Sequence, residues 1–117
     1  MKVLYLDDDT ISRFLVCQAV KDKYEIDAVE KAEEAFELAK NNDYEILLID
    51  INLNDPNIDG FGVLEKLKTF SHLKDSTYIA HTNYFGEEWK LKCIDGGFHY
   101  YNPKPFMLSE FEKLIKK

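Results

Sequence analysis

Short runs of consecutive apolar residues alternate along this chain with longer segments in which apolar residues recur at helical spacing. Uninterrupted apolar runs are typical of strands that are buried on both faces. Five segments are strand-like, the second of them only weakly: residues 3–6, 24–29, 44–50, 77–80 and 98–101. Five others have helical character: residues 10–22, 30–41, 61–70, 86–95 and 108–116. The pattern therefore predicts five successive strand–helix units, an α/β fold with a doubly wound parallel sheet.

Individual segments add detail to this prediction. The segment 44–50 is the most apolar and is expected at the centre of the sheet, whereas the weaker segment 24–29 is expected at an edge. Thr10 is a candidate N-cap for the first helix. Five apolar residues recur at helical spacing in that segment: Ile11, Leu15, Val16, Ala19 and Val20.

Length and charge restrict the possible functions. A chain of 117 residues is large enough for one core, so residues 1–117 are predicted to form a single domain. The formal net charge of −7 argues against direct binding of nucleic acid or of an anionic membrane. No apolar stretch approaches the roughly 20 residues of a membrane span, and the N-terminus does not resemble a signal peptide. A cytoplasmic protein is therefore expected.

Chemically informative residues follow several of the predicted strands. Asp7 and Asp8 come directly after the first strand, and Asp50 ends the third. Thr82 follows the fourth strand and Lys104 the fifth. Because ligands bind outside the carboxyl ends of parallel strands, these side chains are expected to converge. Clustered carboxylates call for a divalent cation such as Mg²⁺, and an ammonium and a hydroxyl beside them suit an incoming phosphoryl group.

Four short motifs resemble those of one known family, the receiver domain of two-component response regulators. The matching motifs, in chain order, are Leu6-Asp7-Asp8, Ile49-Asp50 with Asp59-Gly60 beyond it, Thr82, and Lys104-Pro105-Phe106. The resemblance extends from Val3 to Lys116 and needs no gap between Thr82 and Lys104. It implies a flavodoxin-like sheet with strand order 2-1-3-4-5 and five flanking helices.

The resemblance also implies a role for each matching residue. Asp50 would accept a phosphoryl group from a sensor histidine kinase or a histidine phosphotransfer protein. Mg²⁺ would be held by Asp7, Asp8, Asp50 and the main-chain carbonyl of Asn52. Thr82 and Lys104 would contact phosphoryl oxygens, and Tyr101 would be an aromatic switch that follows Thr82. The protein would then signal to a downstream protein target as a switch, not as an enzyme in the ordinary sense.

Some features depart from the family pattern, and other functions stay open. The loop 51–58 is two residues longer than usual, Asn83 and Tyr84 follow Thr82, and Pro103 precedes Lys104. One alternative is an interaction module on the same fold that never needs phosphate. Another is a receiver that belongs to a longer regulator or hybrid kinase. A third is a dehalogenase-like phosphatase, since Asp7 and its neighbours resemble the paired acids of that family.

Overall fold

The computed structural model describes residues 1–116 and contains one five-stranded sheet. All neighbouring strands run parallel, in the order β2-β1-β3-β4-β5. The strands are β1 (Lys2–Leu6), β2 (Glu25–Val29), β3 (Ile46–Ile49), β4 (Thr77–Thr82) and β5 (Tyr100–Pro103). The predicted fold class and strand order are confirmed.

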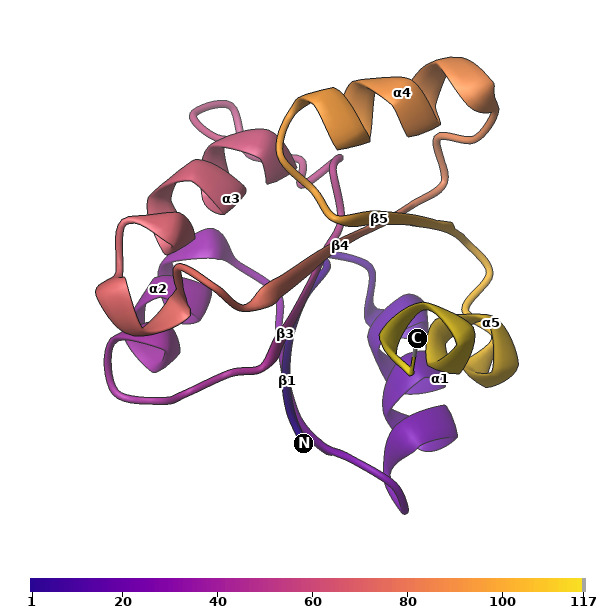
Figure 1. The fold of residues 1–117 in the computed structure, drawn as a ribbon, viewed down its shortest axis with the longest axis horizontal. Helices are drawn as coiled ribbons and strands as arrows, with labels where there is room; N and C mark the ends of the chain where they lie inside the picture. The colour runs from indigo at the N-terminus through magenta and orange to yellow at the C-terminus, as the bar shows by residue number, and fades with distance from the viewer. Residues whose placement is uncertain (117) are drawn as a thin grey trace.

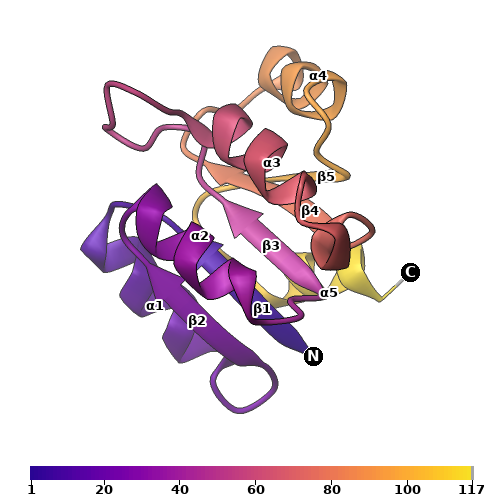
Figure 2. The ribbon, with the colours of Figure 1, turned by 90° about the vertical axis from the view of Figure 1, so that its left-hand side faces the viewer.

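Helices cover both faces of this sheet. Helices α1 and α5 lie on one face, and α2, α3 and α4 lie on the other (Figure 1); in Figure 2 the face that carries α2 and α3 is turned toward the viewer. Their bounds are α1 (Thr10–Val20), α2 (Ala32–Lys40), α3 (Gly60–Lys68), α4 (Glu87–Asp95) and α5 (Leu108–Ile115). A single 3₁₀ turn, Ser71–Leu73, follows α3.

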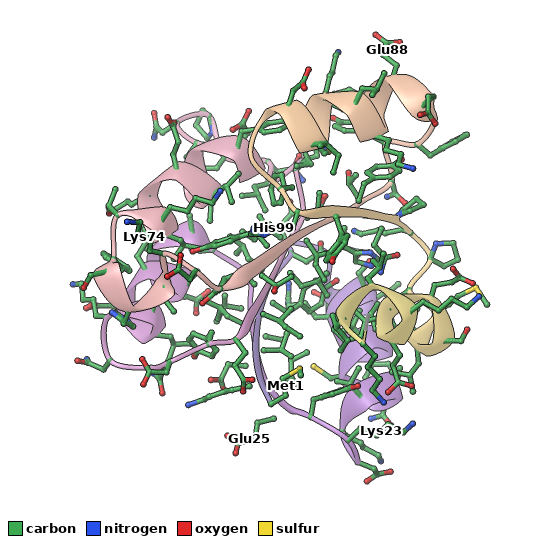
Figure 3. All side chains as sticks on the ribbon, viewed as in Figure 1. Met1, Lys23, Glu25, Lys74, Glu88 and His99 are labelled. Atoms are coloured by element: carbon green, nitrogen blue, oxygen red, sulfur yellow. The ribbon has the colours of Figure 1, made fainter. Side chains whose placement is uncertain are left out.

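The core consists of two apolar clusters, one on each face of the sheet. Every residue of β3 is buried, as expected for the central strand, whereas β2 at the sheet edge is only partly buried. Charged side chains such as Lys23, Glu25 and Lys74 lie on the outside of the molecule (Figure 3). The sheet is thus packed between two apolar layers. This packing holds the ends of its strands in place.

Helix α1 differs from its prediction at the N-cap, and its apolar face is only partly buried. Its N-cap is Asp9, not Thr10, because the Asp9 carboxylate accepts a hydrogen bond from the Ser12 backbone N–H. The apolar residues that recur at helical spacing are only partly covered: Val16 and Val20 are buried, but Ile11, Leu15 and Ala19 are exposed. The helix contacts the sheet through a stripe narrower than its apolar face, so apolar residues remain on its outer side.

The bounds of the last two strands also differ from the prediction. Strand β4 extends to Thr82, and β5 begins at Tyr100 and ends at Pro103. Proline is tolerated there because β5 is an edge strand, where a missing N–H faces no partner strand. The Lys104 backbone N–H donates to the Thr82 carbonyl at 2.8 Å, which keeps the two strand ends together.

No helix within residues 1–116 is both long enough and apolar enough to cross a membrane.

Candidate functional site

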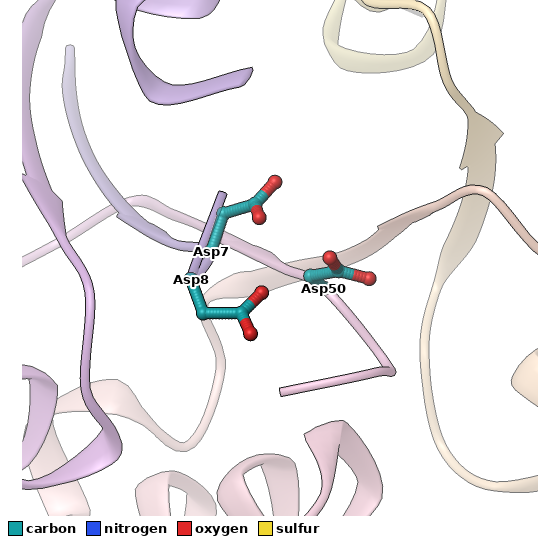
Figure 4. Close-up of side chains that lie close together, drawn as sticks. All are labelled: Asp7, Asp8 and Asp50. Carbon is teal, nitrogen blue, oxygen red and sulfur yellow. The ribbon is translucent and has the colours of Figure 1, made fainter. Parts of the chain in front are cut away.

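Three aspartates meet where β1 and β3 end. Asp7 and Asp8 follow β1, and Asp50 follows β3, which pairs directly with β1. The Asp50 backbone N–H donates to the Leu6 carbonyl at 2.9 Å and so continues the ladder beyond the strands. One oxygen of each carboxylate lies within 4.8 Å of the others (Figure 4). The three acids therefore converge, as the sequence predicts.

Lys104 from the loop after β5 reaches into this group of acids. Its Nζ lies 2.8 Å from Oδ2 of Asp7 and 3.1 Å from Oδ2 of Asp50. The Lys104 side chain is only 7% exposed, and both carboxylates that it contacts are buried. One ammonium is thus shared between two buried carboxylates, while Asp8 remains half-buried beside them.

Burial and mutual repulsion decide the charge state of these groups. Burial and the nearby charge of Asp7 raise the pKa of Asp50 to about 6, against the opposing effect of Lys104. Burial by itself would lower the pKa of Lys104, but its bonds to the two carboxylates outweigh this and raise the pKa above its ordinary value. The site is a place where negative charge is costly and a cation is favoured.

Asp7 has further partners that the sequence motifs do not indicate. Its Oδ1 accepts the Asp9 backbone N–H at 2.9 Å, and its Oδ2 accepts the Tyr5 hydroxyl at 2.6 Å. Burial, and then the charge of Asp7, raise the pKa of Tyr5 well above its usual range, so this phenol is a permanent donor. We refer to Tyr5, Asp7, Asp50 and Lys104 as the Lys104 network.

One of the polar contacts of Asp7 follows from strand periodicity, and another comes from helix α1. Tyr5 lies two residues before Asp7, so strand alternation places both side chains on the same face. Arg13 lies on the first turns of α1, and its guanidinium donates to the Asp7 carbonyl at 2.7 Å. Neither residue belongs to a recognisable motif, because Tyr5 lies within an apolar run and Arg13 lies on a helix face.

Thr82 and Tyr101 are joined through Tyr84. The Thr82 hydroxyl is buried and accepts the Tyr84 backbone N–H at 3.2 Å, and the Tyr101 hydroxyl donates to the Tyr84 carbonyl at 2.6 Å. The Tyr84 ring in turn stacks on Trp89 of α4, with centroids 4.4 Å apart. The predicted switch pair therefore shares one segment, between β4 and α4.

His81 lies on the opposite face of β4 from Thr82, as strand alternation predicts. Its Nδ1 is 2.9 Å from the Asn102 carbonyl, and its ring packs against Phe106 and Tyr5. Burial lowers the pKa of His81 to about 4, so this imidazole is neutral at pH 7. Its contacts are those of a core residue that borders the site.

The long loop after β3 is anchored at both ends. The Asn52 backbone N–H donates to Asp50 Oδ1 at 3.2 Å, and Ile51 and Leu53 are buried. At the far end, a Cβ added to Gly60 would lie 2.6 Å from the Asp50 carbonyl oxygen, so only glycine allows α3 to begin this close. The loop is therefore fixed against Asp50 despite its length.

The donor set suits a hard divalent cation. Three carboxylates supply oxygen ligands only, which are the ligands that Mg²⁺ prefers, and they face a single ammonium. Burial, and then the nearby charge of Asp7, raise the pKa of Asp50, so the ionised carboxylate would be stabilised by an added cation. The residues present could therefore hold a metal ion.

A parallel sheet that carries an acidic site at its carboxyl edge has its ligand site where doubly wound sheets usually have it, and comparison with known proteins shows the family. The family model "Response regulator receiver domain" matches residues 3–116. The chain therefore belongs to the response regulator receiver domain family, whose members are signalling proteins of two-component systems. This match favours the receiver interpretation over the phosphatase alternative.

Curated relatives and solved structures agree with this assignment. The chain is 32% identical over 111 residues to the transcriptional regulatory protein HprR of Escherichia coli, covering 94% of this chain and 48% of that protein. It is 31% identical to the transcriptional regulatory protein SrrA of Staphylococcus aureus, covering 98% of this chain and 46% of that protein. The chain thus spans about half the length of these relatives.

Among solved structures, the fold is similar to that of the Vibrio cholerae chemotaxis protein CheY4. The TM-score is 0.86 at 24% identity, and 98% of this chain and 95% of that chain are covered. A CheY-like receiver domain protein from Methanospirillum hungatei gives a TM-score of 0.82 at 26% identity, covering 98% and 90%.

Proposed function

We propose that this chain accepts a phosphoryl group on Asp50 in a Mg²⁺-dependent reaction. The donor would be a phosphohistidine on a sensor histidine kinase or a histidine phosphotransfer protein. The observation that supports this most directly is the Lys104 network, in which one buried ammonium is shared by two buried carboxylates with a third acid beside them. Such a site favours both an added cation and a group that Lys104 can contact in place of a carboxylate.

Mg²⁺ would be held by the carboxylates of Asp7, Asp8 and Asp50 and by the main-chain carbonyl of Asn52. When bound, the ion supplies positive charge that neutralises phosphoryl oxygens and the surrounding acids. It would also favour the ionised form of Asp50, whose pKa is otherwise raised to about 6. The nucleophile would then be charged throughout the neutral pH range.

The transfer itself asks more for alignment than for a strong nucleophile. A carboxylate oxygen of Asp50 would form a bond to phosphorus while the bond between phosphorus and the donor imidazole nitrogen breaks. The electron pair of the broken bond stays on that nitrogen. Lys104 would turn from a carboxylate to a phosphoryl oxygen, and the Thr82 hydroxyl would donate to another.

A movement of Thr82 would be transmitted through Tyr84. The Thr82 hydroxyl currently accepts the Tyr84 N–H, and Tyr101 is bonded to the carbonyl of the same residue. A Thr82 hydroxyl that turns to a phosphoryl oxygen changes the first contact, and the segment that carries the second is displaced with it. The surface around Tyr101 and α4 would be the part that a downstream protein target reads.

The test is phosphoryl incorporation from acetyl phosphate in the presence of Mg²⁺. Intact-mass spectrometry is expected to show a gain of one phosphoryl group, and reductive trapping with borohydride should locate it on Asp50. Asp50→Asn should abolish the labelling, and chelation of Mg²⁺ should suppress it. The matched control is Asp55→Asn, because Asp55 is an exposed aspartate of the same loop and should not affect the labelling.

Absence of labelling in the folded wild-type protein would overturn the proposal. The phosphate-independent interaction module would then be the better interpretation. In that case Asp50→Asn would leave the function of the protein in cells unchanged.

A further inference from the structure

We propose that Tyr5 is a positioning residue of the acidic site, whose buried hydroxyl holds the Asp7 carboxylate so that Lys104 can leave it. This inference rests on the proposed function, because it concerns the same Mg²⁺ site. Tyr5 lies outside the four motifs that carry the resemblance to the receiver family, and its role follows from its contacts in this chain.

Tyr5 lies in apolar surroundings. Its side chain is fully buried in the apolar cluster beneath α1 and α5, and its ring lies beside that of His81. A phenol hydroxyl in such a place needs a hydrogen-bond partner, because an unpaired buried donor is costly. Its partner is Asp7 Oδ2, 2.6 Å away, a distance typical of a strong hydrogen bond to a carboxylate.

The two oxygens of the Asp7 carboxylate have different hydrogen-bond donors. Oδ1 has one donor, the backbone N–H of Asp9, and Oδ2 has two, the Tyr5 hydroxyl and the Lys104 ammonium. When Lys104 turns to a phosphoryl oxygen, Oδ2 keeps the Tyr5 hydroxyl. With phenylalanine at this position Oδ2 would depend on Lys104 alone, and the release of Lys104 would leave a buried carboxylate oxygen without a donor.

Two consequences follow for the wild-type site. The Tyr5 bond fixes the orientation of Asp7 from the core side, which leaves its other lone pairs directed to the place where the acids converge. It also weakens the ion pair between Asp7 and Lys104, because the hydrogen bond from Tyr5 already compensates part of the carboxylate charge. Loss of the hydroxyl should therefore weaken Mg²⁺ binding and slow phosphorylation together.

The chain contains a matched control at another place in the same fold. Tyr44 is also buried, and its hydroxyl donates to Oδ2 of Asp27 at 2.6 Å, the same distance as in the Tyr5 bond. In this second pair Tyr44 lies two residues before β3 and Asp27 lies in the middle of β2, away from the carboxyl ends of the strands. Tyr44→Phe should disturb the core in the same way without touching the site.

The experiment measures Mg²⁺ affinity by isothermal titration calorimetry without a phosphodonor. Tyr5→Phe is expected to weaken binding roughly tenfold, the lower end of the effect typical of residues that orient metal ligands. Tyr44→Phe should bind as the wild type does. In the Asp7→Asn background, Tyr5→Phe should have little further effect, because its influence acts through the Asp7 charge.

Labelling with acetyl phosphate provides a second measurement of the same effect. The rate for Tyr5→Phe should fall most at low Mg²⁺ and should recover in part at saturating Mg²⁺. A core defect alone would lower the rate equally at all Mg²⁺ concentrations, as Tyr44→Phe would show.

A third measurement uses the wild-type protein and does not depend on the folding of a variant. With tyrosine labelled at ¹³Cζ, the resonance of Tyr5 should shift on addition of Mg²⁺ with the affinity found by calorimetry. The Tyr44 resonance should stay constant.

The outcomes separate this inference from the proposed function. If the wild type binds Mg²⁺ and is labelled, but Tyr5→Phe behaves as Tyr44→Phe does, the role of Tyr5 is refuted and the proposed function stands. An unchanged Tyr5 resonance would refute that role equally. If the wild type neither binds Mg²⁺ nor is labelled, both fail.

Discussion

At two places in this molecule, carboxylates contact a tyrosine hydroxyl and at least one lysine ammonium. A carboxylate pKa is raised at one place and lowered at the other. One is the Lys104 network at the carboxyl edge of the sheet. The other, the Glu112 network, lies where α5 meets the chain before β2. There Glu112 accepts the Tyr24 hydroxyl at 2.7 Å and pairs with Lys116 at 2.9 Å and with Lys23 at 3.4 Å.

The difference lies in how many acids share the cations and how deeply they are buried. Glu112 is a single half-buried acid with two ammoniums, and the hydrogen bonds from Tyr24 and Lys116 lower its pKa to about 2. In the Lys104 network two buried acids share one ammonium, and burial raises the pKa of Asp50 to about 6. The same chemical groups thus stabilise the folded state in the Glu112 network, whereas in the Lys104 network the buried negative charge is only partly compensated.

The largest effect is expected from removing the shared ammonium. Lys104→Met would leave two buried carboxylates uncompensated and should lower the free energy of unfolding by about 3 kcal/mol at pH 8 without Mg²⁺. Lys116→Met, the matched change in the Glu112 network, should cause only a small fraction of this loss, because Lys116 is exposed and Lys23 remains. Urea unfolding of the two variants measures the difference, and equal losses would contradict the comparison.

A smaller effect, with opposite signs in the two networks, is expected from neutralising the acids. The pKa of Asp50 is higher in the folded protein than the ordinary 3.8, so its charge lowers stability as the pH rises through the window from 3.8 to about 6. Asp50→Asn should therefore raise the free energy of unfolding by about 2 kcal/mol above pH 6 without Mg²⁺.

The pKa of Glu112 is lower in the folded protein than the ordinary 4.5, so its contribution is present above pH 4.5 and is lost as the pH falls toward 2. Glu112→Gln should lower stability at pH 7 and converge with the wild type at low pH. Stability curves between pH 3 and 8 test both variants, and curves with the same sign would refute the assignment of these charges.

The smallest effect is expected from the Tyr24 hydroxyl. Tyr24→Phe removes one donor to Glu112 but leaves both lysines in place, and the ring still contacts Phe111. The melting temperature should fall by less than in Glu112→Gln, and the acid-induced loss of stability should be smaller than in the wild type and complete at a higher pH, because the folded pKa of Glu112 lies closer to 4.5. A drop larger than that of Glu112→Gln would show that Tyr24 acts through something other than this carboxylate.

The sequence predicted the parts of the molecule that depend on strand order and on residues at strand ends. The convergence of Asp7, Asp8, Asp50 and Lys104 follows from parallel strands whose carboxyl ends share one edge, and the structure confirms it. The central position of the third strand followed from its continuous apolar run. Both inferences use one-dimensional patterns that map directly onto a sheet.

The features that the sequence did not predict depend on which neighbour packs against a given face. The exposure of Ile11 and Leu15 depends on how narrow the contact of α1 with the sheet is, and periodicity does not report that width. Asp9 and Thr10 are both residue types that cap helices well, and sequence alone does not show that the Asp9 side chain accepts the capping hydrogen bond. In the sequence, Tyr5 looks like one more apolar position of β1. Its polar role depends on Asp7, which lies on the same face and accepts its hydroxyl.

The stack of Tyr84 on Trp89 has a practical consequence for anyone who studies this switch. Trp89 is the only tryptophan in the chain, and it lies one contact away from the segment that links Thr82 to Tyr101. Indole emission therefore originates from a single location that borders the moving parts, with no background from elsewhere. The native chain carries its own optical reporter, and no dye or engineered label is needed to follow the site in real time.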